Sequence, residues 1–295
     1  MQARLGAMTL PFCGHTFEKA LDGLVEAGFR YVCLGLPHSR HFVPHPDDDD
    51  ARLRLIVDAC ARRSLNPIML ICLTHAEHEG GQQTWIKTVH HAATMEIPYV
   101  LGMGTWSFKD PHDPLAGEKS YAERAAEEER WLAVMRPVCD EATLLGITIV
   151  IKPHTGNTAT ALQCRRLIET IRHPAMGICY DAGNVHFYEG VEPQADLPIT
   201  VNHVRALCLK DHLGPRFHPD FPTPGDGSIN HAAIFEILKK ANFHGPMLIE
   251  RVDGTLDAGR MAYAEIVSRL RRAKQNIEEA AKKAGLELEA NSSPR

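Results

Sequence analysis

The chain has 295 residues, of which 44% are hydrophobic and 23% are charged, as is typical of a globular protein. Its formal net charge of −5 argues against nucleic-acid binding, and its apolar runs are too short to cross a membrane. The first residues, MQARLGAMTLPFCGH, lack the long apolar core of a signal peptide, so we expect a cytoplasmic protein.

Eight short apolar segments have the length expected of buried strands. In chain order they are residues 3–9, 31–38, 67–75, 98–106, 147–154, 176–182, 205–212 and 246–252. Segments with helical spacing of apolar residues lie between them, at residues 16–30, 47–65, 121–146, 158–172 and 231–245. A last helix is expected to begin near Asp257 and to run past Lys283.

The alternation of strands and helices predicts the fold class. Strands that alternate with helices pair in parallel through right-handed crossovers. Eight such units predict an α/β protein, a (β/α)8 TIM barrel with an extended C-terminal helix. An open doubly wound sheet is the alternative, but no GxGxxG motif follows the first strand.

The chain shows no linker, so we expect a single barrel domain over residues 1–275. Residues 276–295 are expected to form a C-terminal helix extension and a disordered tail. The helix end, KQNIEEAAKKAG, is mostly polar, and we expect it to project from the barrel.

The fifth strand ends in an unusual way, with the residues VIKPH at 150–154. Side chains alternate across a strand, so Lys152 and His154 lie on one face while Ile151 and Pro153 lie on the other. Active sites of TIM barrels lie at the carboxyl ends of the strands. We therefore expect Lys152 and His154 to point into the mouth of the barrel.

The next three strands also end in polar residues. Asp181 ends the sixth strand, and Glu250 lies on the inward face of the eighth. Cys208, Lys210 and His212 share one face of the seventh strand. The convergence of these groups predicts a functional site, and a buried salt-bridge cluster without function is the alternative interpretation.

Other polar residues near the strand ends are candidates for substrate binding: His38, His75, Trp106, Asn184, His186 and Arg251. A single strand-end histidine such as His38 or His75 more often caps or packs. His90, His91 and His231 fall in helical segments, where we expect them to face solvent. The proline-rich loop 213–230 is expected to form a lid or a wall of the site.

Three segments resemble the sugar-phosphate isomerase/epimerase family, the xylose isomerase-like barrels. They are CYDAGNVHFYEG (179–190), ALCLKDH (206–212) and PGDGSINHAAIFEILKKANFHGPMLIE (224–250). The resemblance implies a TIM barrel, a small-molecule sugar substrate and one divalent metal. In that family the metal is held by Glu, Asp, His and Glu from strands five to eight. The two Glu also move a proton beside a carbonyl that the metal polarises.

The resemblance is carried over position by position with two departures. Asp181 and Glu250 match the ligands of strands six and eight. Lys152 stands at the glutamate position of strand five, and Cys208 stands at the histidine position of strand seven. A lysine ammonium group does not bind a metal and repels one nearby, so the two-carboxylate mechanism is in question.

One hypothesis keeps a metal at shifted positions. His154, Asp181, His212 and Glu250 would then hold Mn, Zn, Co or Fe, with Cys208 as an alternative thiolate ligand. The shift moves the strand-five ligand outward by about 6–7 Å, which is an objection to this site.

A second hypothesis dispenses with the metal. Lys152 or Lys210 would then stabilise an enolate or form a Schiff base, in a lyase or hydratase reaction on a keto-sugar. A third hypothesis is a non-catalytic sugar-binding relative. We expect an isomerase or epimerase that acts next to a carbonyl. Glu250 is the expected base, and Lys152, His154 and Lys210 are its expected catalytic partners. The sequence is also compatible with a homo-oligomer.

Overall fold

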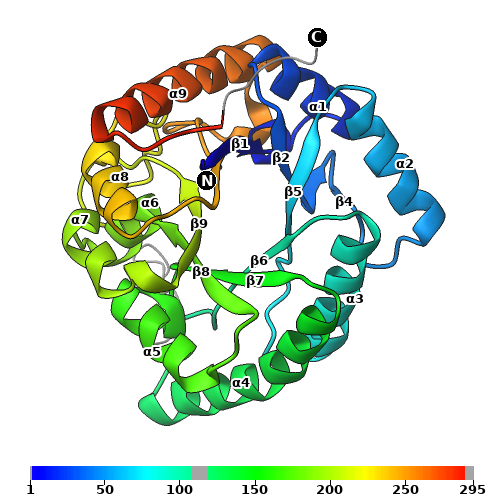
Figure 1. Ribbon diagram of the computed structural model, residues 1–295, viewed down its shortest axis with the longest axis vertical. Helices are drawn as coiled ribbons and strands as arrows, with labels where there is room; N and C mark the ends of the chain where they lie inside the picture. Colours follow the sequence, from blue (N-terminus) through cyan, green and yellow to red (C-terminus); the bar gives the residue numbers. More distant parts are fainter. Residues whose placement is uncertain (1, 108–118, 290–295) are drawn as a thin grey trace.

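The computed structural model describes residues 2–107 and 119–289. Within these residues eight parallel strands close into one barrel, which confirms the predicted TIM barrel and excludes the open sheet (Figure 1). Neighbours around the barrel follow the order β1, β10, β9, β8, β7, β6, β5 and β2. The strands are β1 (Arg4–Met8), β2 (Tyr31–Leu34), β5 (Asn66–Ile71), β6 (Tyr99–Met103), β7 (Thr148–Lys152), β8 (Met176–Asp181), β9 (Val204–Leu209) and β10 (Pro246–Ile249).

Helices surround the barrel (Figure 1). The long ones are α1 (Phe17–Glu26), α2 (Asp50–Ala61), α3 (Gly81–Thr94), α4 (Tyr121–Leu144), α5 (Ala161–Ile171), α8 (His231–Lys240) and α9 (Tyr263–Ala284). Their starts follow from local chemistry: for example, the Ser120 hydroxyl and the Glu123 carboxylate form a reciprocal capping box at α4. In the described part of the chain, no helix combines the length and the apolar character needed to cross a membrane.

The connection from β8 to β9 departs from the regular pattern. It contains α6 (Ala182–Asn184), the π-helical turn η3 (Val185–Glu189) and α7 (Pro193–Asp196) in place of one long helix. The 3-10 turns η4 (Leu197–Ile199) and η5 (Val201–His203) complete it. Other 3-10 turns are η1 (Leu10–Phe12), η2 (Gly156–Thr158) and η6 (Ala258–Arg260). A π-turn inside a helical segment often marks a functional position.

Most predicted strands run too far at their carboxyl ends. β7 ends at Lys152 rather than at residue 154, and β9 ends at Leu209 rather than at residue 212. The predicted strand 31–38 breaks at Gly35, which has a φ of +92°. After it, β3 (Leu36–His38) leaves the barrel and pairs with β4 (His41–Val43) in an antiparallel hairpin.

The side-chain alternation predicted for strand five is confirmed. Val150 packs inside the barrel with Cys179 and Leu248, whereas Ile149 and Ile151 pack between the strands and the outer helices. The fifth strand therefore presents Lys152 on the same inward face as Val150.

The predicted projection of the last helix is wrong. Ile277, Ala281 and Ala284 of α9 are buried, as is Leu286 beyond it. The backbone N–H of Glu289 donates to the carbonyl of Ala3 at 2.8 Å, beside β1. Exposed polar residues such as Lys282 and Lys283 lie on the outer face of the helix. The predicted tail lies outside the described residues from 290 onward.

Candidate active site

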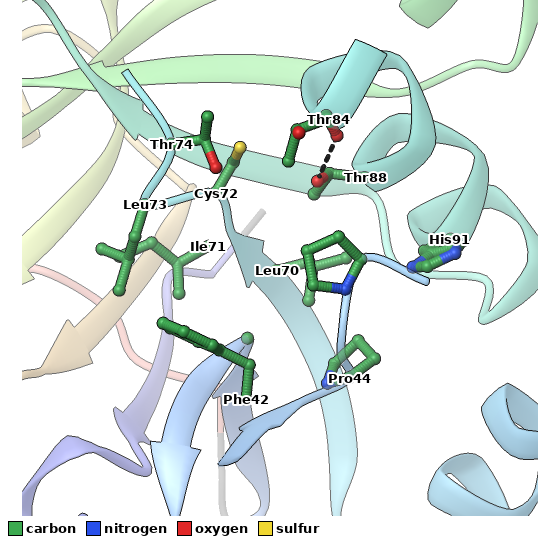
Figure 2. Close-up of a pocket in the computed structure, with 12 residues that line it drawn as sticks. Phe42, Pro44, Leu70, Ile71, Cys72, Leu73, Thr74, Thr84, Thr88 and His91 are labelled. Atoms are coloured by element: carbon green, nitrogen blue, oxygen red, sulfur yellow. Dashed lines mark hydrogen bonds between the residues drawn. The ribbon is translucent and has the colours of Figure 1, made fainter. Parts of the chain in front are cut away.

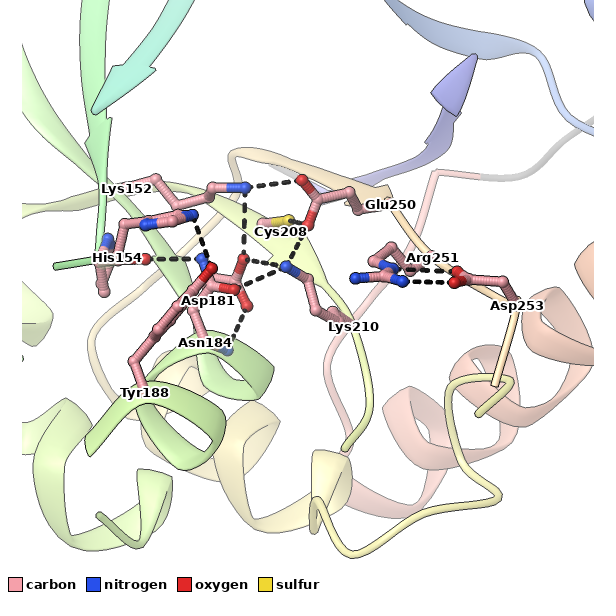
Figure 3. A network of polar contacts seen from close by, with 11 residues as sticks. Lys152, His154, Asp181, Asn184, Tyr188, Cys208, Lys210, Glu250, Arg251 and Asp253 are labelled. Carbon is pink, nitrogen blue, oxygen red and sulfur yellow. Dashed lines mark hydrogen bonds and ion pairs between the residues drawn. The ribbon is translucent and has the colours of Figure 1, made fainter. Parts of the chain in front are cut away.

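Five side chains from four neighbouring strands meet in the mouth of the barrel (Figure 3). Lys152 and Asp181 end β7 and β8, Cys208 lies in β9, and Lys210 and Glu250 directly follow β9 and β10. Each of these residues is at most 6% exposed. The structure thus brings together the five groups that the sequence placed on inward-facing strand ends.

Two ammonium groups lie between two carboxylates in this cluster. The Nζ atom of Lys152 lies 2.6 Å from Oε1 of Glu250 and 3.5 Å from Oδ2 of Asp181. The Nζ atom of Lys210 lies 2.6 Å from Oε2 of Glu250 and 3.4 Å from the same oxygen of Asp181. The charges therefore balance, which offsets part of the cost of removing them from water.

The charges also fix the protonation states. Burial alone would raise the pKa of Glu250, but Lys152 and Lys210 hold that pKa well below its usual range. Burial alone would lower the pKa of Lys152, but Glu250 outweighs it and raises that pKa well above the usual value. The pKa of Lys210 is raised against burial by Asp181 and Glu250. Both lysines are therefore charged and are poor nucleophiles for a Schiff base.

The segment DAGN after β8 positions Asp181 and Lys210. Oδ1 of Asp181 accepts from the backbone N–H of Asn184 at 2.9 Å, and Nδ2 of Asn184 donates to the carbonyl of Pro153 at 2.8 Å. Lys210 donates to Oδ1 of Asn184 at 2.6 Å. A Cβ atom at Gly183 would lie 2.8 Å from Cγ of Lys210, so this close approach requires glycine.

The donor set implied by the family does not fit a divalent metal here. Among the described residues, Asp181, Cys208 and Glu250 are the one group of three with donor atoms within 4.8 Å of one another. Both Glu250 oxygens already contact ammonium groups, and the Cys208 thiol donates to Oε2 of Glu250 at 3.2 Å. Burial, followed by the charge of Asp181, raises the pKa of Cys208 well above its usual value, which disfavours a thiolate ligand.

The metal site predicted at shifted positions is not assembled. His154 and His212 do not join the group formed by the two predicted acids. β7 ends at Lys152 and β9 ends at Leu209, so the chain has left each strand before it reaches the histidine. Both imidazoles instead contact side chains of the surrounding loops.

His154 lies beside the charged cluster and next to Tyr188 (Figure 3). Its Nε2 lies 3.1 Å from the hydroxyl of Tyr188, and its ring centroid lies 5.0 Å from that of Trp106. Trp106 in turn contacts His75 edge to face. Nδ1 of His154 is buried without a hydrogen-bond partner in the described residues. Burial, and then the charge of Lys152, lowers the pKa of His154 well below its usual value, so the ring is neutral.

Tyr188 belongs to the candidate site, although the sequence did not predict it there. It lies in the π-turn η3, seven positions after Asp181 in the quoted segment CYDAGNVHFYEG. Beyond the end of a strand, the spacing of residues does not show which side chains face the barrel mouth. Only the resemblance of the whole segment could have indicated Tyr188.

His212 and His186 form part of the wall of the site. Nε2 of His212 donates to the carbonyl of His218 at 2.7 Å, and a carbonyl oxygen accepts only. Burial lowers the pKa of His212, so its other nitrogen carries no proton and accepts from Nδ1 of His186 at 2.6 Å. The pair therefore holds the start of loop 213–230 against η3.

Asp211 fixes the far end of the same loop, and the prediction that His231 faces solvent is wrong. The Asp211 carboxylate accepts from the backbone N–H groups of Gly225, Gly227 and Ile229 at 2.8–3.2 Å. The ring of His231 is buried, with Nε2 3.5 Å from Oδ2 of Asp211. The first residue of α8 therefore faces Asp211 rather than solvent.

Arg251, another predicted substrate-binding residue, lies at the same side of the mouth (Figure 3). Its guanidinium group donates to both carboxylate oxygens of Asp253. It also lies over the ring of Phe221, 4.0 Å from the centroid, and Nζ of Lys210 lies 5.6 Å from the same centroid. Phe221 thus joins loop 213–230 to the charged cluster.

His38 is not part of this constellation. Its ring is 3% exposed and packs edge to face on Phe17, with a centroid distance of 5.5 Å. Burial lowers the pKa of His38, and the backbone groups of Phe12 and His15 partly oppose this shift. The residue therefore packs where β3 leaves the barrel, as the packing interpretation of a single strand-end histidine predicted.

A separate small cavity of about 70 Å³ lies between β5, the β3–β4 hairpin and α3 (Figure 2). Phe42, Leu70 and Cys72 line it together with Thr88 and His91. None of the five charged-cluster residues borders this cavity, so it is distinct from the candidate active site. His90 is exposed as predicted, whereas His91 is half-buried at the edge of the cavity.

Known proteins resemble this chain over most of its length. The inosose dehydratase of Clostridium beijerinckii is 23% identical over 272 residues, which cover 85% of this chain and 87% of that protein. A xylose isomerase domain protein from Planctomyces limnophilus superposes with a TM-score of 0.72 at 15% identity, covering 97% and 99% of the two chains. A D-psicose 3-epimerase crystallised with D-fructose gives a TM-score of 0.72 at 14% identity, covering 96% and 99%.

The sequence profile of the family described as xylose isomerase-like TIM barrel matches residues 21–278. This match includes β2 to β10 and every member of the charged cluster. The chain therefore belongs to the xylose isomerase-like TIM barrel family.

Proposed function

We propose that the chain is a dehydratase for a keto-sugar or a ring ketone of the inosose type. It would remove a proton from the carbon beside the carbonyl and expel a hydroxyl group from the next carbon. The observation that carries the proposal is the position of Lys152, a buried cation where the resemblance implies a proton-moving carboxylate.

Lys152 is the group best suited to bind the substrate carbonyl. Within the described residues its ammonium group has one close partner, Glu250 at 2.6 Å, and a longer contact to Asp181. Lys210 is more fully engaged, since both Glu250 and Asn184 lie 2.6 Å from its Nζ. A fixed N–H donor on Lys152 would stabilise the enolate oxygen that forms when the proton leaves.

His154 is the better candidate for the base. Both oxygens of Glu250 contact ammonium groups, which makes this carboxylate a weak proton acceptor. His154 offers a buried ring nitrogen without a partner, and its other nitrogen is oriented by Tyr188. In the tautomer in which Nε2–H donates to the Tyr188 oxygen, Nδ1 carries the lone pair that accepts the proton.

The reaction balances without an oxidant or a second substrate. The α-carbon loses its proton to His154, and the electron pair forms the enolate. The enolate then expels the hydroxyl group from the β-carbon, and a proton supplied through the His154–Tyr188 pair completes a water molecule. The product retains every other atom of the ketone and gains a carbon–carbon double bond. Where this double bond carries a hydroxyl group, the resulting enol tautomerises to a ketone.

Elimination is favoured over epimerisation by the number of proton-moving groups. Epimerisation needs a base and an acid on opposite faces of one carbon. The family pattern supplies two carboxylates for this purpose, and Lys152 replaces one of them here. Similarity to a protein named inosose dehydratase supports elimination, and similarity to a D-psicose 3-epimerase supports enolate chemistry in the same barrel. Epimerisation through the same enolate is the second candidate, and a binding protein without turnover is the third.

A product analysis in D2O separates these candidates. The protein is incubated with a panel of inososes and keto-hexoses, and the products are examined by mass spectrometry and NMR. A dehydratase gives a product that lacks one water, whereas an epimerase gives a substrate isomer that carries deuterium beside the carbonyl. Saturable binding with neither product would contradict both enzymatic proposals. Arg165→Met, at an exposed ion pair with Glu169, serves as the control variant.

A further inference from the structure

The three candidate metal ligands of the barrel all face charged or polar groups of the protein itself. Glu250 contacts Lys152 through one oxygen and Lys210 through the other, both at 2.6 Å. Oδ2 of Asp181 faces the same two ammonium groups at 3.4–3.5 Å, as an ion pair without a hydrogen bond in the described residues. Cys208 holds its proton toward Glu250. The positions around these oxygens that a cation would take are therefore occupied by positive charge.

We propose that the Lys152–Lys210 pair replaces a divalent cation in this barrel, so that Asp181, Cys208 and Glu250 bind no divalent metal. The inference concerns the same site as the proposed function but stands on its own geometry. It would hold even if the substrate were not a ketone.

The charge balance supports this inference. Two lysines bring two positive charges, the charge of one divalent ion, and the two carboxylates neutralise them. A metal entering the intact cluster would add two further positive charges to a site in which every member is at most 6% exposed. It would also have to displace ammonium groups from both oxygens of Glu250.

The same geometry identifies the substitutions that would open the site. Lys152→Glu removes the ammonium group from Oε1 of Glu250 and places a carboxylate at the end of β7. Cys208→His supplies an imidazole in place of a protonated thiol. Lys210 then keeps Asn184 as a partner at 2.6 Å. The double variant therefore offers three carboxylates and one imidazole, a donor set that suits Mn²⁺.

The test is a calorimetric titration with Mn²⁺ of chelator-treated protein, with metal content measured after dialysis. The wild-type chain is expected to show no saturable binding that depends on Asp181. The double variant is expected to take up about one equivalent, and Asp181→Asn in that background should abolish the uptake. Cys208→His alone, which keeps both lysines, is the matched control and should bind as little as the wild type.

Two results would overturn the inference. One is a wild-type chain that binds one equivalent of Mn²⁺ and loses it in Asp181→Asn. The other is a folded double variant, judged by circular dichroism, that binds no more Mn²⁺ than the wild type. If the double variant does not fold, the wild-type titration and its Asp181→Asn control still decide. Because the readout is metal uptake, a lack of activity on every ketone would count against the proposed function alone.

Discussion

Nζ of Lys152 lies 2.6 Å from Oε1 of Glu250. Lys152 is the last residue of β7, and Glu250 is the first residue after β10. This contact crosses the mouth of the barrel and joins two strands that are not neighbours in the sheet. It places a positive charge against a carboxylate that the family resemblance assigns to metal binding and proton transfer. The chemistry proposed for the chain follows from this pair.

Removal of Lys152 should destabilise the protein, because it leaves Glu250 and Asp181 buried with one cation fewer. Lys152→Met is expected to lower the free energy of unfolding by about 3–5 kcal/mol, measured by urea denaturation. Arg165→Met, which breaks an exposed pair, should change it by less than about 0.5 kcal/mol. Lys152→Met/Glu250→Gln should lose less than the sum of the single variants. Strict additivity would show that the pair is not coupled.

Gly183→Ala should damage the site through Lys210. The added Cβ atom would lie 2.8 Å from Cγ and 2.9 Å from the carbonyl oxygen of Lys210, so the lysine must shift. We expect a loss of about 1–3 kcal/mol together with a loss of turnover. Gly146→Ala is the control, since that glycine has a φ of +70° but no neighbour within 4 Å. It should lose about 1 kcal/mol and keep its activity. Equal activity in the two variants would contradict the positioning role of Gly183.

Asp211→Ala should release loop 213–230 from the barrel. The substitution leaves the N–H groups of Gly225, Gly227 and Ile229 without their acceptor. Hydrogen exchange should accelerate across the loop, and the Michaelis constant should rise more than the turnover number falls. Glu169→Gln, at the exposed pair with Arg165 outside the loop, is the control. Unchanged exchange in Asp211→Ala would show that other contacts hold the loop.

Stability should fall on mild acidification, and His38 should contribute. Burial lowers the pKa of His38, with Glu18 as the charged group that partly opposes the shift. The His38 imidazole therefore binds a proton near pH 6.5 in the unfolded chain but only at lower pH in the folded chain. This contribution is fully present above that pH and is lost as the pH falls below it. The melting temperature should decrease less between pH 7.5 and pH 5.5 in His38→Gln than in the wild type, and an identical decrease would contradict the assignment.

The parts of the fold that follow from periodicity were predictable. The β-branched run 147–151 predicts a strand with an inward and an outward face, and Val150 and Ile151 occupy those faces. Strand ends were predicted less well, because His154 and His212 continue an alternating pattern after the backbone has left the sheet. The alternation of residue types predicts which face of a strand a side chain lies on, but it does not predict the last residue that pairs with the neighbouring strand.

The candidate site was predictable in its members and not in its contacts. The inward faces placed Lys152, Lys210 and Glu250 in one mouth, but which ammonium group meets which oxygen depends on the register of nonadjacent strands. The buried ring of His231 lies against Asp211, and no local pattern records this contact between residues 20 positions apart. Tyr188 reaches His154 from a π-turn, whose direction follows neither the helical nor the strand period.

The most direct test is the rate of water loss from inososes and keto-hexoses by chelator-treated protein, compared between the wild type and Lys152→Met. We predict that the wild type forms the dehydrated product at the same rate with and without chelator. Lys152→Met should lose about 10²–10³-fold in turnover, the usual effect of removing one donor to a developing oxyanion. A wild-type rate that disappears with chelator and returns with Mn²⁺ would contradict the account.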